Sequence, residues 1–185
     1  MKLYYDILRL CVGLTLLCNC SSGDRQQQKH ATGAAQSAPY ELLVVANKEW
    51  LPTPAGKALM DVVESPVEGL PQYEPCFRCT KINPAAFNAT FKMYSNIVFA
   101  EVGSKHQQAE MRTNRDVYCR PQLIVYLYAP TAQAFMELME SRREQIVGMF
   151  NEQELSRERR RLAKKHSGKV ERQARKPFGV RIYAP

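Results

Sequence analysis

Short apolar runs along the chain predict five β-strands. Residues 41–46 form a continuous apolar run, which is typical of a strand covered on both faces. Val117 to Tyr128 alternates in period two, and Pro121 places the first part of that strand at an edge or a bulge. The remaining strands are predicted at residues 73–82, 96–102 and 178–183.

Three helices are predicted between these strands. Thr53-Pro54 and Asn83-Pro84 each pair a capping residue with a proline in the first turn. The first of these helices turns Ala58, Leu59, Val62 and Val63 inward, and the second spans residues 85–94. The longest helix starts at Pro130-Thr131, and its apolar stripe comprises Phe135, Leu138, Met139, Ile146, Met149 and Phe150.

The predicted order is therefore β-α-β-α-β-β-α-β, an α+β or α/β fold with helices packed on a mixed sheet. Residues 103–115 are polar and predict a loop, and Asn151 with Glu154 predicts a bend in the last helix. Because the sequence stops just after a strand, we expect a domain that is truncated at its C-terminus.

The first 20 residues have the layout of an export signal. Lys2 and Arg9 precede an apolar run that is too short to span a bilayer. The run ends in Leu17-Cys18-Asn19-Cys20, which resembles a bacterial lipobox and predicts that Cys20 is lipidated. The alternatives are an ordinary signal peptide cut near Ser21 or Ser22 and a buried N-terminal helix. Residues 21–38 are polar and predict a flexible tether, followed by a domain at 39–185.

The positive charge of the chain is concentrated in one segment. Residues 156–176 carry ten basic and two acidic side chains, whereas residues 21–155 carry thirteen basic and fifteen acidic ones. The segment 157–176 is either a solvated helix end or a contact for anionic lipid, glycan or envelope proteins. Nucleic acid is not an expected partner, because no aromatic residues interleave the charges.

The cysteines offer little specific chemistry. Cys76 and Cys79 have the spacing of a redox motif or half a zinc site, but residues three apart on a strand point to opposite faces. A disulfide that joins Cys119 to one of them is an open alternative in an oxidising compartment. His30, His106 and His166 lie in polar stretches, where solvent-exposed side chains are expected. No metal or cofactor is therefore predicted.

The sequence contains none of the common nucleophile, metalloprotease or phosphate-loop motifs, and no catalytic residue is assigned. A weak ligand site is predicted at Asn47, Lys48 and Trp50, which follow the first strand. Ligands tend to bind at the carboxyl ends of strands in such sheets.

Several stretches together resemble the DUF4837 family of Bacteroidetes lipoproteins. These are ESPVEGLPQYEPCF (64–77), NPAAFNATFKMYSNIVFAEV (83–102), YCRPQLIVYLYAP (118–130) and MFNEQE (149–154). The resemblance implies a lipoprotein of the cell envelope, and it supplies no catalytic residues.

The leading functional hypothesis is a membrane-anchored envelope lipoprotein, periplasmic or on the outer membrane, that acts by binding or assembly. The alternatives are a hydrolase or transferase of envelope polymers, whose active site lies partly in a missing C-terminal region, and a thiol-based periplasmic factor.

Overall fold

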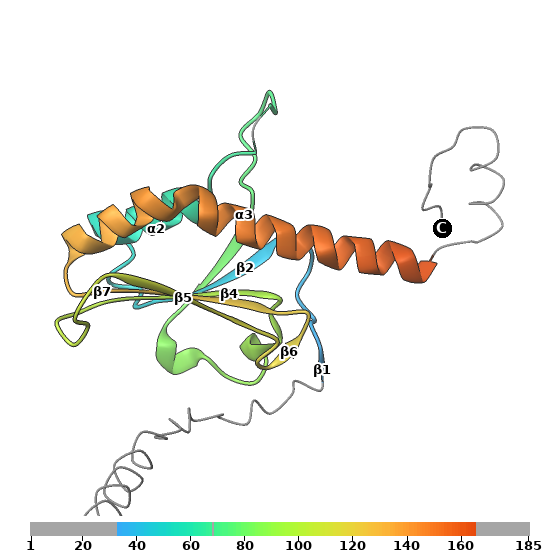
Figure 1. Cartoon of the computed structure of the whole chain (residues 1–185), viewed down its shortest axis with the longest axis horizontal. Coiled ribbons are helices and arrows are strands. Elements are labelled where there is room, and N and C mark those ends of the chain that lie inside the picture. Colours follow the sequence, from blue (N-terminus) through green and yellow to red (C-terminus); the bar gives the residue numbers. More distant parts are fainter. Residues whose placement is uncertain (1–32, 68, 166–185) are drawn as a thin grey trace, which may run out of the picture.

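Five strands form one mixed sheet in the order β3-β2-β4-β7-β5. The computed structural model describes residues 33–67 and 69–165. Strands β3, β2, β4 and β7 run parallel, and β5 is antiparallel to β7 (Figure 1). The strands span Glu41–Val45 (β2), Arg78–Ile82 (β3), Asn96–Val102 (β4), Glu110–Arg115 (β5) and Leu123–Ala129 (β7). The prediction of a mixed α+β fold is confirmed.

Helices α2 (Pro54–Val63) and α3 (Ala132–Lys165) cover one face of the sheet (Figure 1). Helix α2 begins as predicted, since Thr53 Oγ1 accepts a hydrogen bond from the Gly56 N–H at 3.3 Å. The predicted stripe of α3 enters the core, where Phe135, Ile146 and Phe150 are fully buried. They pack against inward residues of the three central strands, which are Leu42, Val44, Val98, Leu123, Val125 and Leu127.

The opposite face is covered by residues 83–95, where the predicted helix 85–94 is wrong. Two short 3-10 turns, η1 (Pro84–Ala86) and η2 (Phe91–Met93), stand in its place. The Asn88 side chain accepts hydrogen bonds from the N–H groups of Thr90 and Phe91, which competes with helical bonding. Phe87 and Phe91 pack on this face of the sheet instead of along one helix.

The predicted loop 103–115 contains the edge strand β5. Its side chains are mostly exposed, so the sequence lacks the apolar alternation that identifies a half-buried strand. The predicted strand 117–128 is interrupted at Pro121. Its first part is β6 (Cys119–Arg120), which pairs with β1 (Gly33–Ala34) in a small separate sheet.

Helix α3 is continuous through Asn151, so the predicted start of a second helical segment there is wrong. Glu154 does not cap a second helix, because its side chain is 2% exposed and binds the amino end of the sheet. The helix then continues for about three more turns past the amino ends of the strands (Figure 1). Among the described residues, no helix combines the length and apolar character needed to cross a membrane.

The domain includes the last residues of the predicted tether. Besides the pairing of β1, the N–H groups of Ala35 and Gln36 donate to the carbonyls of Arg120 and Met93 at 3.0 and 2.9 Å. Residues 33–38 are therefore fixed to the domain. The signal segment with Cys20, the rest of the tether, His30, His166 and the predicted strand 178–183 lie outside the described residues.

Candidate ligand-binding site

A cavity of about 860 Å³ lies at the carboxyl ends of the parallel strands. Strand β2 leads through α2 to β3 at one side, whereas the loop after β4 leads to β5 at the other. The neighbouring strands β2 and β4 are therefore followed by loops that lead to opposite sides of the sheet. Such a switch point opens a crevice in parallel sheets, and ligands bind there across many α/β proteins.

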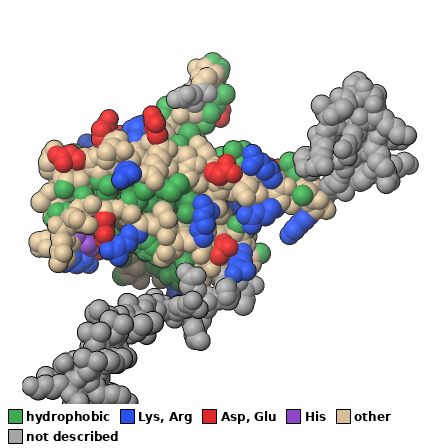
Figure 2. All heavy atoms as spheres, in the orientation of Figure 1, with side chains coloured by type: hydrophobic (Ala, Val, Ile, Leu, Met, Phe, Trp, Pro, Cys, Tyr) green, Lys and Arg blue, Asp and Glu red, His purple; other side chains and the backbone are tan. Residues whose placement is uncertain are grey.

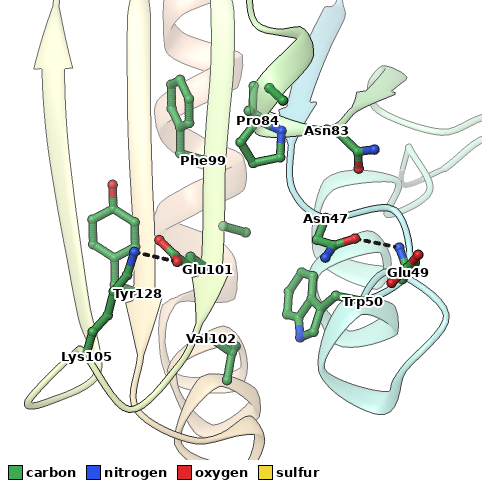
Figure 3. A pocket seen from close by; sticks show the side chains of 13 residues that line it. Asn47, Glu49, Trp50, Asn83, Pro84, Phe99, Glu101, Val102, Lys105 and Tyr128 are labelled. Carbon is green, nitrogen blue, oxygen red and sulfur yellow. Dashed lines mark hydrogen bonds and ion pairs between the residues drawn. The ribbon is translucent and has the colours of Figure 1, made fainter.

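Two loops and the sheet itself form the walls of this cavity (Figure 3). The β2–α2 loop contributes one wall, and the start of η1 contributes the next. The remaining wall comes from β4, the loop after it, and β7. The principal lining side chains are Asn47, Glu49, Trp50, Asn83, Pro84, Phe99, Glu101, Val102, Lys105 and Tyr128.

Trp50 is held firmly against the first turn of α2. Its carbonyl accepts hydrogen bonds from the Thr53 N–H at 3.0 Å and the Thr53 hydroxyl at 2.7 Å. Its ring meets Phe135 edge to face at a centroid distance of 5.1 Å. A Cβ atom on Gly56 would lie 2.5 Å from the Trp50 carbonyl oxygen, so only glycine allows this close approach. The aromatic wall of the cavity is therefore preorganised.

Two asparagine side chains are oriented by backbone contacts. Asn47 Oδ1 accepts from the Glu49 N–H at 2.9 Å, and Asn83 Oδ1 accepts from the Lys48 N–H at 2.8 Å. These bonds assign the oxygen of each amide to the backbone. Each NH₂ group, which has no hydrogen-bond partner among the described residues, is left as a donor for a ligand.

The β4 side of the cavity carries a charged cluster. Glu101 pairs with Lys105 at 2.6 Å, and His106 Nε2 lies 3.6 Å from the Glu101 carboxylate. The His106 ring stacks on Tyr128 at a centroid distance of 4.7 Å. A second cavity of about 580 Å³ adjoins here and adds Glu110 and Arg112 to the lining.

His106 differs from the sequence expectation in burial. The His106 side chain is only 15% exposed, so the expectation of a solvent-exposed residue is wrong for this histidine. Burial, reinforced by Tyr126 and Glu101, raises the pKa of Tyr128 above its ordinary value. Tyr128 therefore stays protonated at neutral pH and keeps a hydroxyl that can donate a hydrogen bond.

The cysteines take no part in this site. Cys76, Cys79 and Cys119 are free thiols in the structure, so the alternative of a disulfide among them is not realised. Burial, with Glu64 next in effect, raises the pKa of Cys79 to about 12, and burial raises that of Cys119 to about 11. Thiols with such high pKa values are poor nucleophiles at neutral pH. Within the described ranges, no group of three or more metal-ligating side chains is present.

Two of the three predicted ligand residues line the cavity. Asn47 and Trp50 do so, whereas Lys48 contributes its backbone N–H, which orients Asn83. Five further lining residues were not predicted from the sequence: Glu49, Asn83, Glu101, Lys105 and Tyr128. All of these lie in or just after the carboxyl ends of β2, β3, β4 and β7. The criterion that identified Trp50, a place at the carboxyl end of a strand, would therefore also have identified them.

Comparison with known proteins gives one match. The family described as "Domain of unknown function (DUF8532)" has a model that matches residues 35–163. The expected membership of DUF4837 is therefore wrong, and the link to Bacteroidetes that depended on it is withdrawn. No curated protein and no solved structure matches the chain.

Proposed function

The chain belongs to the DUF8532 family, whose description assigns no function, and we propose from its own geometry that it is a ligand-binding protein anchored by lipid in the bacterial cell envelope. The observation on which this proposal depends is the preorganised cavity at the strand switch point. The proposed location in the cell envelope is supported by residues 1–20, which resemble an export signal, and by Cys20 at their end.

The composition of the cavity favours a small, uncharged, polyhydroxylated ligand such as a sugar. Glu49 and Glu101 offer acceptors, and the amides of Asn47 and Asn83 offer donors. Hydroxyl groups can satisfy both kinds of group, because each is a donor and an acceptor. The rings that line the cavity, Trp50, Phe99 and Tyr128, add apolar surface for the C–H groups of such a ligand.

Phosphorylated or carboxylated ligands fit this cavity less well. Lys105 is the one basic side chain on its lining, and the Glu101 carboxylate already neutralises that charge at 2.6 Å. Glu49 forms no ion pair among the described residues, so the lining carries a net negative charge. An anion would therefore be repelled at short range.

Replacement of Trp50 by alanine is expected to weaken sugar binding by about tenfold or more. The reason is that the indole ring offers the sugar an apolar contact that contributes about 2 kcal/mol to the binding free energy. A panel of mono- and disaccharides would be titrated into the protein by calorimetry. The matched control is Tyr73→Ala, which removes an aromatic ring that is 70% exposed and lies outside the cavity.

Circular dichroism would verify that both variants fold. Equal affinities of Trp50→Ala and the wild type for the best sugar would show that the cavity is not the binding site. A complete lack of binding across the panel would contradict the proposed ligand class.

Metabolic labelling with a fatty-acid probe tests the anchor. The wild-type chain is expected to take up label and Cys20→Ser to take up none, because the acyl chains are attached to that sulfur. Cys18→Ser is the control, since it removes a neighbouring thiol and leaves Cys20 in place. Persistent labelling of Cys20→Ser would overturn the anchoring proposal.

A further inference from the structure

The amino end of the sheet is where the chain enters the domain. Arg157 of α3 donates hydrogen bonds to the carbonyls of Ser37 and Ala38, and the Glu154 carboxylate accepts from the Tyr40 N–H at 3.1 Å. Glu154 also accepts from the Asn96 amide at the start of β4. The segment that comes from Cys20 is thus held against the second half of α3.

Helix α3 continues past this point as an exposed basic arm. Residues 155–164 carry five basic side chains and one acidic side chain. Arg157, Arg160, Arg161 and Lys164 have the spacing of one helix face, and the last three are exposed. Figure 2 shows blue side chains gathered over this part of the helix. Figure 1 shows β1 and the far end of α3 at the same end of the sheet.

An exposed tyrosine side chain lies beside the arm. Tyr40 is 42% exposed, and it lines a hollow of the surface together with Arg157 and Arg161 of α3. Amphipathic tyrosine rings are enriched at the level of lipid headgroups, where basic side chains also find phosphate groups. An exposed tyrosine ring beside several basic side chains is therefore the composition expected of a surface that contacts lipid headgroups.

The proposed lipid anchor lies close in sequence to the strand β1, at the amino end of the sheet. Twelve residues separate Cys20 from Gly33, and a fully extended chain of that length spans only about 45 Å. A bilayer surface is therefore within reach of the arm whenever the anchor is inserted.

We propose that the surface formed by Tyr40, Arg160, Arg161 and Lys164 lies against anionic phospholipid headgroups. The ligand cavity is at the carboxyl ends of the strands, so it then faces away from the membrane. The contact itself does not depend on lipidation, and it can be measured on a chain without acyl groups.

Vesicle binding tests the contact. Residues 20–185 with Cys20→Ser would be sedimented with phosphatidylcholine vesicles that do or do not contain phosphatidylglycerol. We expect binding to the anionic vesicles only, and weaker binding at high salt. Combined replacement of Arg160, Arg161 and Lys164 by alanine is expected to weaken it about 100-fold, which is about fivefold for each charge near the surface.

The matched control removes three exposed basic side chains elsewhere, by Lys48→Ala, Lys57→Ala and Arg142→Ala. This variant is expected to bind like the parent. Equal losses in the two triple variants would show that only net charge matters and would overturn the proposed surface. Binding to a soluble acidic polysaccharide without binding to vesicles would overturn it in favour of a glycan.

The orientation is tested on the acylated protein with lipids that carry a quencher in the headgroup region. Trp50 is the single tryptophan of the chain, so its fluorescence reports the cavity. It is expected to remain unquenched. In a second variant that combines Tyr40→Trp with Trp50→Phe, the new indole is expected to be quenched. Stronger quenching of Trp50 than of that indole would contradict the orientation.

Discussion

Replacement of Glu154 by alanine is expected to lower the free energy of unfolding by about 3–5 kcal/mol, the usual cost of removing one partner from a buried ion pair. The Glu154 side chain is 2% exposed and lies 3.6 Å from Arg157. It also accepts a hydrogen bond from Asn96 at 2.6 Å. Alanine would leave the guanidinium and the buried Asn96 amide without these partners.

Urea unfolding followed by circular dichroism would measure this loss. Glu152→Ala is the matched control on the same helix, because its ion pair with Arg159 joins side chains that are 63% and 70% exposed. Such a pair is worth about 0–1 kcal/mol. Glu154→Gln keeps an acceptor oxygen and is expected to fall between the two. A loss for Glu154→Ala no larger than that for Glu152→Ala would show that the network does not stabilise the fold.

Phe135→Ala is expected to cost about 3–5 kcal/mol, because it leaves a large cavity in the main core. Phe135 is fully buried near the start of α3, and its ring contacts Trp50 edge to face. The substitution should therefore also loosen the aromatic wall of the ligand cavity. Core packing and site geometry are linked through this one contact.

Intrinsic fluorescence separates these two effects. Phe150→Ala is the matched control, since Phe150 is equally buried on α3 but packs on Phe77 at a centroid distance of 5.8 Å. Both variants are expected to lose similar stability, and only Phe135→Ala should shift the emission of Trp50. The same shift in both folded variants would mean that Phe135 does not position Trp50.

The parts of the fold that the sequence predicted well are those with a strong local signal. The apolar run at residues 41–46 became a central strand, and Thr53-Pro54 fixed the start of α2 within one residue. The stripe from Phe135 to Phe150 predicted the buried face of α3. In each case the pattern reflects burial, which does not depend on the details of the neighbouring elements.

The parts that the sequence predicted poorly depend on tertiary contacts. The helix expected at 85–94 is replaced by turns, because Asn83 and Asn88 bond to backbone groups outside a helix. Strand β5 exists because its backbone pairs with β7, although its own side chains give no apolar alternation. The apolar and polar pattern of one segment contains no direct information on bonds to distant backbone groups or on pairing with another strand.

The candidate site was predicted only in part for a related reason. Trp50 and Asn47 were found from one strand end, but the sheet order that brings Asn83, Glu101 and Tyr128 to the same cavity was not known. The alternative of an envelope hydrolase or transferase stays a prediction, since its active site was expected partly beyond Pro185.

The strand order also has a consequence for self-association. The two outer strands are β3 and β5, and each displays two basic side chains, Arg78 with Lys81 and Arg112 with Arg115. If a second copy extended the sheet at either border, these charged side chains would lie beside the new strand and would lose part of their hydration. This cost disfavours continuous sheets between molecules, even when many copies are crowded together on one surface.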